Sequence, residues 1–400
     1  MLNCRIEPIM PHVTPILSCA VRAAPLAFLL SSPLAASDAS AAGSEWRDVP
    51  ISAEAFDVSA ANSASFEERD GRSTLCLDGE AFLRDVTLTD GSISVDIAND
   101  RHRHFANLVF RAASRHDYET AYLRLHKSGQ FDAMQYTPHL NGETNWQLFG
   151  EAQAVANFGD SPWVTLTVDF ADDRARIRVG PEGGRPLVET MLTLPAQAGG
   201  IGLRTQFRGC FSNFRYTAQR PTFDPAKLSK PVEAPVGAIM RWSLSDAFRM
   251  EAWAGLSASY PAMREWDTVS AEPNGRLLVS RYRRKTDAGG DEDGRLDGVH
   301  AGVAIHSPAT QSASLQIDAS DMATVWLNGN VLFAYDNSFR AKGPLFRGDF
   351  NASRQTLALP LRKGRNELVV LVADRANGWG LAGAVQADET VRIEPLGNGN

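Results

Sequence analysis

Hydrophobic and polar residues alternate with a period of two along most of the chain between Ser73 and Thr217. The segment 163–170 shows the pattern most clearly, because its apolar and polar side chains separate onto opposite faces of an extended strand. The apolar set is Val164, Leu166, Val168 and Phe170, and the polar set is Thr165, Thr167 and Asp169. This periodicity predicts a strand with one face in a core.

A second alternating segment follows at once and predicts an antiparallel hairpin. Asp172-Asp173 supplies the turn, and residues 174–179 alternate arginine with apolar side chains. Further strands are predicted in the segments GSISVDIA, NLVFRAA, TAYLRLH, PLVETMLTL and GGIGLRTQF. Long amphipathic helices are missing from the sequence, and without crossover helices the sheets must be antiparallel. The predicted fold class is all-β, with a β-sandwich of the jelly-roll kind.

Residues 220–237 interrupt the pattern with four prolines and few large apolar groups. Proline removes backbone donors and stiffens the chain, so a Pro-rich linker is predicted here. Beyond it the β pattern resumes, with Asn328-Gly329 as a two-residue hairpin signal and LRKGRN (361–366) as a second tight turn. We therefore predict two β-sandwich domains, at residues 44–219 and 238–396.

The first 43 residues differ in character from the rest of the chain. An apolar run of roughly a dozen residues follows Arg22 and ends in small residues, with Ala39-Ser40-Ala41 as a cleavage box. This pattern predicts a signal peptide in residues 1–43 and a periplasmic or secreted location. A lipid anchor on Cys19 is disfavoured, because the hydrophobic run follows the cysteine instead of preceding it.

Length and charge narrow the range of partners. The chain has 400 residues, a formal net charge of −7 and a pI near 5.7, and 44% of its residues are hydrophobic. This length favours two domains. The acidic balance gives no basic field for nucleic acid, and no apolar run reaches the roughly 18 residues of a membrane span. We expect neutral or mixed partners, and the sequence leaves the oligomeric state open.

Two cysteines remain after removal of the predicted signal peptide, Cys76 and Cys210. An exported chain favours a disulfide between them, but both lie in apolar strand segments, where buried free thiols are also common. The sequence leaves both alternatives open. Metal ligation by this pair is disfavoured, because no CxxC or His-pair spacing accompanies it.

Three stretches of the first half carry a resemblance to a known superfamily. They are residues 105–150, with the strand end Phe110-Arg111 and the Tyr-x-Arg strand of Tyr122 and Arg124, residues 163–180, and the closing stretch 199–217 with its strand FSNFRYT. Most of residues 45–219 resembles the concanavalin A-like lectin/glucanase superfamily, in its laminin-G-like and 3-keto-disaccharide-hydrolase-like branch. The second half, through VWLNGNVLFAYDNSFR and LPLRKGRNELVVLVAD, resembles the galactose-binding-domain-like sandwich. The resemblance implies a lectin-like domain followed by a sandwich that binds carbohydrate or braces its neighbour.

Aromatic and amide side chains gather in residues 131–150 and on the strands before them. Rings stack on the C–H faces of sugars, while amide and guanidinium groups bind sugar hydroxyls. We predict that one open face of the first sandwich forms a ligand-binding groove from seven residues: Arg111, Tyr122, Arg124, Gln135, Tyr136, Asn141 and Trp146. The alternative is that Tyr136 and Trp146 pack between the sheets while the arginines pair with acids on the outer face.

Catalytic motifs are sparse, and no catalytic residue is assigned. The glucanases of the superfamily that this chain resembles carry Glu-x-Asp-x-x-Glu on one strand, and this chain has no such triplet. Asp96 stands alone on its strand, which favours a surface or turn-anchoring role. Glu119, Glu143 and Glu151 are the acids that could pair in space. Nucleophile elbows, phosphate loops and His-Glu-x-x-His are absent.

Two segments contain candidate metal ligands, but the spacing of neither segment predicts a complete ligand set. His102 and His104 fall on one face of an extended segment without a third ligand, which favours a polar loop. Residues 286–298 crowd four aspartates into a glycine-rich loop: Asp287, Asp291, Asp293 and Asp297. Such loops bind Ca²⁺ in some proteins, but this spacing does not fit the twelve-residue helix-loop-helix pattern. No cofactor is predicted, with Ca²⁺ at this loop as the alternative.

Together these features predict an exported protein that binds carbohydrate or a cell-envelope glycan without catalysis of its own. One alternative, implied by the resemblance, is a glycoside hydrolase-like enzyme acting on (3-keto-)disaccharides or glycans. A second alternative is a structural or protein-interaction module, a role that laminin-G-like domains often have.

Overall fold

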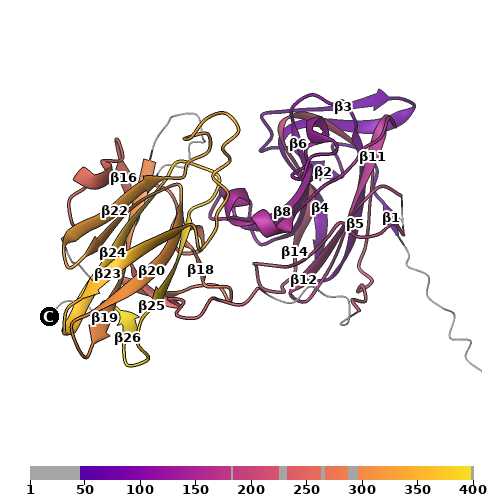
Figure 1. Cartoon of the computed structure of the whole chain (residues 1–400). Helices are drawn as coiled ribbons and strands as arrows, with labels where there is room; N and C mark the ends of the chain where they lie inside the picture. Colours follow the sequence, from indigo (N-terminus) through magenta and orange to yellow (C-terminus); the bar gives the residue numbers. More distant parts are fainter. Residues whose placement is uncertain (1–45, 182, 225–231, 263–265, 287–295, 398–400) are drawn as a thin grey trace, which may run out of the picture. The chain divides into compact units, whose positions relative to one another are not determined.

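The computed structural model describes residues 46–181, 183–224, 232–262, 266–286 and 296–397. Strands dominate these ranges, accompanied by one short α-helix, α1 (Val279–Tyr282), and by four 3₁₀ turns at Leu125–Lys127, Trp146–Leu148, Gly150–Ala152 and Gly255–Ser257. No helix in the described part of the chain is long and apolar enough to cross a membrane. The all-β prediction is confirmed (Figure 1).

The N-terminal sandwich is built from one continuous network of antiparallel strands. In chain order they are β1 (Arg47–Asp48), β2 (Phe56–Asp57), β3 (Ser63–Arg69), β4 (Arg72–Leu88), β5 (Gly91–Ala98), β6 (Phe105–Ala112), β7 (Tyr118–Leu123), β8 (Met134–Leu140), β9 (Glu143–Thr144), β10 (Gln153–Ala154), β11 (Trp163–Ala171), β12 (Arg174–Val179), β13 (Val188–Met191) and β14 (Gly199–Thr217). The main path of neighbours runs β10-β8-β7-β6-β14-β5-β11-β12-β13.

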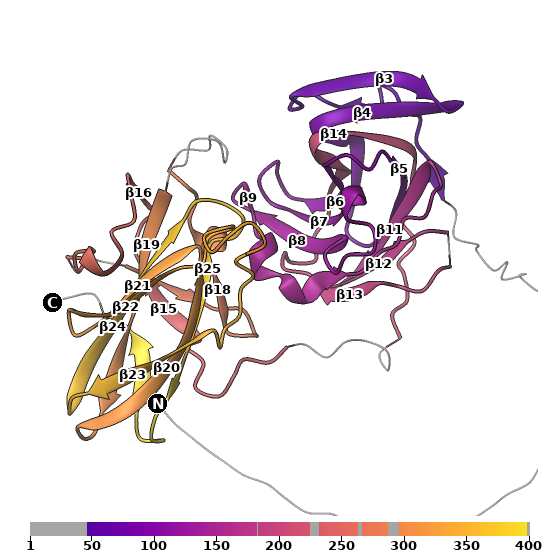
Figure 2. The ribbon, with the colours of Figure 1, turned by 45° about the horizontal axis from the view of Figure 1, so that its top comes forward.

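Two long strands hold this network together. β14 pairs with β6 along its first half, with β4 from Gly199 to Phe211 and with β5 from Phe211 to Thr217, and β4 also pairs with β3. Figure 2 shows β3 beside β4 and β14 between β5 and β6. Because each long strand contributes to more than one layer, the two faces of the sandwich belong to a single hydrogen-bonded sheet that curls on itself.

The alternation read from the sequence sets the two faces of β11. Its apolar residues Leu166, Val168 and Phe170 are fully buried in the core. On the other face the polar residues meet the polar side chains of β5: Thr167 bonds Ser94 at 2.9 Å. The predicted hairpin to β12 is confirmed, with Asp172 at the turn in the left-handed region (φ 50°).

The C-terminal sandwich consists of an eight-stranded and a four-stranded antiparallel sheet. The larger sheet contains β15 (Arg241–Leu244), β16 (Phe248–Met250), β17 (Asp267–Ser270), β19 (Leu296–Ser307), β21 (Met322–Leu327), β22 (Asn330–Asp336), β24 (Gly364–Asp374) and β26 (Arg392–Pro395). The smaller sheet contains β18 (Arg276–Leu278), β20 (Gln311–Ser320), β23 (Gln355–Leu361) and β25 (Gly380–Gln386). A core that includes Trp242, Trp379 and Leu381 lies between them.

Both predicted turns of this half are present, but they join different partners. Asn328 and Gly329 take φ values of 53° and 79° and close the β21–β22 hairpin, as predicted. The turn at residues 361–366 instead leads from β23 in the four-stranded sheet to β24 in the eight-stranded sheet. It therefore connects two layers, a difference that a local turn motif does not encode.

The predicted domain boundaries stay predictions. The segment 1–43, where the signal peptide is expected, lies outside the described residues, as does 225–231 within the expected linker. The described parts of that linker, 220–224 and 232–237, contain no strand or helix.

The structure resolves the open question about the cysteines. Cys76 on β4 and Cys210 on β14 face each other directly in the strand register and form a disulfide, with a Cα–Cα distance of 4.0 Å. Both residues are buried. The bond joins positions that are 134 residues apart in the sequence and crosslinks the two long strands of the sandwich.

Candidate ligand-binding pocket

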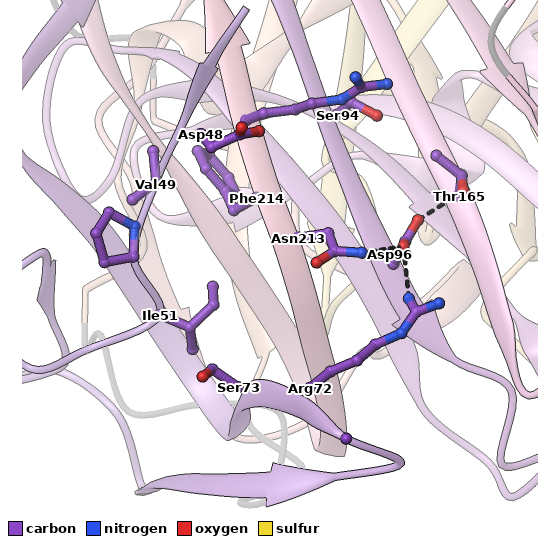
Figure 3. Close-up of a pocket in the computed structure, with 13 residues that line it drawn as sticks. Asp48, Val49, Ile51, Arg72, Ser73, Ser94, Asp96, Thr165, Asn213 and Phe214 are labelled. Atoms are coloured by element: carbon purple, nitrogen blue, oxygen red, sulfur yellow. Dashed lines mark hydrogen bonds and ion pairs between the residues drawn. The ribbon is translucent and has the colours of Figure 1, made fainter.

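A pocket of about 710 Å³ opens on the polar face of the N-terminal sandwich. Five segments far apart in the sequence contribute to it: β1 and the residues after it, the start of β4, β5, β11 and the end of β14. The lining residues are Asp48, Val49, Pro50, Ile51, Gly71, Arg72, Ser73, Ser94, Asp96, Thr165, Asn213, Phe214 and Arg215. Figure 3 shows three of these side chains pointing toward Asp96.

Asp96 is the centre of the polar wall. Its Oδ1 accepts a hydrogen bond from Thr165 Oγ1 at 2.6 Å. Its Oδ2 accepts from Arg72 Nη1 and from Asn213 Nδ2, both at 2.8 Å. The carboxylate is therefore held by a hydroxyl, a guanidinium and an amide, which fixes its orientation at the pocket surface.

A β-bulge in β14 places Asn213 at this site. The register between β14 and β5 shifts between Ser212 and Arg215, and Asn213 takes a left-handed conformation (φ 49°). Phe211 and Phe214 both lie in the core, so the bulge leaves two residues between them, Ser212 and Asn213, and of these two only Asn213 is exposed. Asparagine tolerates this conformation better than most residues, and its amide then reaches Asp96.

Apolar side chains lie opposite Asp96. Val49 and Ile51 lie across the pocket from Asp96 in Figure 3. A ligand that fits between the two walls needs hydrogen-bonding groups on one side and C–H groups on the other.

Arg72 packs over the aromatic ring of Trp163. Its guanidinium carbon lies 5.1 Å from the ring centroid of Trp163, and that ring packs in a small cluster with the Cys76–Cys210 disulfide. Arg69 lies over the same ring at 5.9 Å and pairs with Asp100. The Arg69 guanidinium holds the pKa of Asp100 below its ordinary value, so this neighbouring ion pair persists in weak acid.

Next to the pocket, outside its lining, polar side chains of β5, β11 and β12 form a hydrogen-bonded network. Asp169 accepts hydrogen bonds from Ser92 at 2.8 Å, from Arg176 at 2.9 and 3.0 Å, and from Arg178 at 2.7 Å. These hydrogen bonds join β5, β11 and β12 through their side chains.

The seven residues predicted from the sequence do not line this pocket, and their part in ligand binding stays a prediction. Five of them are buried, with exposed fractions between 0% and 4%: Arg111, Tyr122, Arg124, Gln135 and Tyr136. Asn141 and Trp146 are partly exposed. A polar residue on a strand has a fixed face, but the sequence does not show what covers that face.

Four of the seven converge in a buried network. Tyr122 Oη donates to Gln135 Oε1 at 2.8 Å, and Arg124 Nη2 lies 2.6 Å from Tyr122 Oη. Gln135 Nε2 donates to the backbone carbonyl of Trp146 at 2.7 Å. Arg124 also pairs with the buried Asp132 at 3.0 Å. Burial raises the pKa of Tyr122, as expected for an enclosed hydroxyl.

The remaining three lie apart from that network. Arg111 donates to the Thr89 carbonyl at 2.8 Å and to Asp90 at 3.1 Å. Tyr136 donates to the buried Glu119 at 2.8 Å. Asn141 Nδ2 donates to the Ser280 carbonyl at 2.8 Å. Their role in ligand binding stays a prediction, and their positions are those of structural hydrogen-bonding groups.

The acids named as a possible pair each have a different partner. Burial raises the pKa of Glu119, which accepts hydrogen bonds from Tyr136 and from the amides of Thr193 and Leu194. Glu143 contacts Lys285 at 2.8 Å, and Glu151 contacts Arg276 at 3.1 Å.

The segments considered for metal ions give no ligand set among the described residues. His102 Nε2 donates to the backbone carbonyl oxygen of Arg208 at 2.6 Å, and burial lowers the pKa of His104. The sulfurs of Cys76 and Cys210 lie near Glu67, but they are bonded to each other and are not thiolate ligands. Of the four aspartates of the acidic loop, only Asp297 lies within the described residues, where it accepts from the Thr286 amide at 3.1 Å.

The sequence indicates exposed polar positions at two of the pocket residues, but it does not show that they share one site. Asp96 was assigned to a surface or turn-anchoring role, and Thr165 was placed on the polar face of its strand. Arg72 and Asn213 carried no such signal, because their position depends on strand pairing and on the bulge. The polar run Ser92, Ser94 and Asp96, facing Thr165 and Thr167, is the pattern that could have revealed the shared face.

No protein-family model matches this sequence, and no curated protein matches it. Solved structures similar to the chain include a carbohydrate-binding module, CBM66, from Bacillus subtilis, with 15% identity, a TM-score of 0.32, and coverage of 41% of this chain and 95% of that one. A protein of unknown function with a galectin-like fold from Bacillus subtilis has 14% identity, a TM-score of 0.30, and coverage of 44% and 89%. A Bacillus licheniformis β-glucanase has 12% identity, a TM-score of 0.31, and coverage of 44% and 92%. At these values the likenesses carry no argument about activity, and the superfamily named from the sequence stays a prediction.

Proposed function

We propose that this protein is an exported carbohydrate- or cell-envelope-glycan-binding protein without catalysis of its own, and that the pocket around Asp96 holds the saccharide. The observation that carries the proposal is the convergence of Arg72, Thr165 and Asn213 on Asp96 at one wall of an open pocket. Export follows from the pattern of the first 43 residues.

The chemistry of the polar wall suits sugar hydroxyls. A hydroxyl both donates and accepts, so it needs an acceptor and a donor side by side. Asp96 supplies the acceptor, and Asn213 and Arg72 supply donors at 2.8 Å from it. The apolar side chains of Val49 and Ile51 give the C–H face of a ring a surface to pack against.

The same wall favours binding over hydrolysis. Hydrolysis of a glycosidic bond requires one carboxyl group that gives a proton and a second that attacks or activates water. Both oxygens of Asp96 already accept hydrogen bonds from three donors. A carboxylate held in this way acts as an acceptor that orients a ligand. The second acid of the pocket, Asp48, lies opposite Arg215 in the β1–β14 register.

A glycan-retention experiment on Asn213→Gly tests the proposal. Glycine adopts the left-handed conformation of Asn213 freely, so this change removes the amide while keeping the bulge. We expect at least about tenfold weaker retention on whichever immobilised polysaccharide or array glycan holds the wild type, since one direct hydrogen bond beside a charged group is lost.

Asn328→Gly is the matched control. Asn328 also has a left-handed conformation, at φ 53°, but it lies in the β21–β22 hairpin of the other sandwich. Its substitution is expected to leave retention unchanged. Failure of the wild type to bind any glycan, neutral or acidic, contradicts the proposed function.

A further inference from the structure

We propose that the pocket selects uncharged saccharides over saccharides that carry a carboxylate or sulfate, and that the Asp96–Arg72 ion pair sets this selection. The inference rests on the proposed glycan-binding function and adds the chemical class of the ligand.

The charges that line the pocket are balanced. Its ionisable side chains are Asp48, Asp96, Arg72 and Arg215, two acids and two guanidiniums. Sites for anionic ligands place guanidinium groups in excess, because a planar guanidinium binds a carboxylate or sulfate through two parallel hydrogen bonds. This pocket has no such excess.

Each of the two guanidinium groups has a neighbouring side chain that competes with a ligand for it. Arg72 already donates to Asp96 at 2.8 Å. Arg215 stacks on Trp46, with 4.6 Å from the guanidinium carbon to the ring centroid, and lies directly opposite Asp48 in the β1–β14 register. An anionic ligand at Arg72 therefore has to compete with Asp96 and lie beside a like charge, which opposes binding.

A neutral hydroxyl meets no such opposition. It accepts from Arg72 or Asn213 and donates to Asp96 without separating the ion pair. Thr165 continues to hold Asp96 from its other oxygen, at 2.6 Å. The pair thus works as a fixed donor–acceptor unit for an uncharged ligand.

Two charge variants test the inference in opposite directions. Asp96→Asn leaves Arg72 without its counter-ion, so the pocket becomes net positive. Arg72→Gln leaves Asp96 without its cation, so the pocket becomes net negative. The probes are matched oligosaccharides of equal length that differ only at C6, glucose against glucuronic acid and galactose against galacturonic acid. The readout is the ratio of the two dissociation constants by calorimetry.

The wild type is expected to bind the neutral member at least about fivefold more tightly at low ionic strength. Asp96→Asn is expected to move this ratio at least about fivefold toward the acidic member, and Arg72→Gln to move it the other way. Both shifts are expected to shrink at high salt, because the charges are near the surface. A loss of fold does not produce opposite, salt-dependent shifts of a ratio.

Three results decide the matter. Equal affinity for the two members of each pair, or preference for the acidic one, overturns the inference and leaves glycan binding intact. Variants that weaken both members equally overturn the role of the ion pair. Absence of binding to every probe and every array glycan overturns the proposed function itself.

Asp173→Asn is the control for charge. This residue lies in the β11–β12 turn outside the pocket lining, with a side chain that is 61% exposed, and its substitution is expected to leave the ratio unchanged. Thermal unfolding of each variant confirms that it folds. Since either charge variant alone gives a directional shift, the inference remains testable if one of them does not fold.

Discussion

Arg111 has a different role in the structure from the one that the sequence predicts. It follows Phe110 at a strand end and looks like a group for binding ligands. In the structure it is fully buried, and its guanidinium donates to the Thr89 and Asp172 carbonyls and to Asp90. It lies over the ring of Phe170 at 5.5 Å. The residue thus ties two turns of the N-terminal sandwich together.

Arg111→Met is therefore expected to lower the free energy of unfolding by about 2–4 kcal/mol, because it leaves buried acceptors without a donor. Urea denaturation measures the change. Arg101→Met is the control, since Arg101 is 44% exposed and its contact with Asp160 is 4.0 Å long. An Arg111→Met protein of unchanged stability that no longer binds a glycan contradicts this structural role and restores the ligand-binding one.

Asp96 is the opposite case to Arg111, because the sequence predicts no ligand-binding role for it and the structure places it in a pocket. A lone acid on a strand carries no motif, so its sequence context favoured a surface role. Three donors from β4, β11 and β14 make it the centre of a site. None of the three is within 20 residues of Asp96 in the chain, and no local pattern links them.

Among the elements, β4 and β14 determine the shape of the N-terminal sandwich. The disulfide joins them four residues after Arg72 and three residues before Asn213, so both pocket residues lie close to the crosslink. Trp163 packs against the disulfide, and the guanidinium of Arg72 lies over its ring. The crosslink therefore stabilises the fold and the pocket walls together.

Replacing both cysteines, Cys76→Ala with Cys210→Ala, is expected to cost about 2–5 kcal/mol of unfolding free energy, because the unfolded chain regains the freedom of a long loop. The measurement is denaturant unfolding with and without a reductant. Wild type is expected to lose stability when unfolded and refolded in reductant, whereas the double variant is expected to be insensitive to it. Equal stability of the two proteins under oxidising conditions contradicts a stabilising crosslink.

The bulge at Asn213 is the element-scale feature that alternation misses. A strict period of two through FSNFRYT places alternate residues on one face. The inserted residue instead leaves two successive residues, Ser212 and Asn213, between the core side chains of Phe211 and Phe214. Strand existence was therefore predictable here, and the direction of the side chains was not.

For the whole molecule, four histidines that are buried or partly buried link folding to pH. Burial lowers the pKa of His104, His126, His139 and His300 below the ordinary value of 6.5. For His126 and His300 the pKa falls to about 4. The unfolded chain therefore binds more protons than the native protein below pH 6.5, so native stability is full above that pH and is lost as the pH falls toward 4.

His300 alone is expected to remove about 2 kcal/mol of stability between about pH 8 and pH 5, since one pKa unit corresponds to roughly 1.4 kcal/mol. Its ring stacks on Phe248, with centroids 4.9 Å apart, and lies parallel to Trp266. His300→Phe preserves these stacks, so it is expected to flatten the pH dependence of the urea midpoint by that amount. An unchanged slope in this variant contradicts the assignment to His300.

The sequence by itself determined the β class, the antiparallel pairing, the β11–β12 and β21–β22 hairpins and a two-sandwich architecture. These follow from side-chain period and turn residues, which act over a few neighbouring positions. Only the tertiary structure decided that Cys76 bonds Cys210, that Tyr122, Arg124 and Gln135 are enclosed, and that Arg72, Thr165 and Asn213 meet at Asp96. Those outcomes depend on which strands become neighbours and on what covers each face, and both are set by contacts between residues that are distant in the chain.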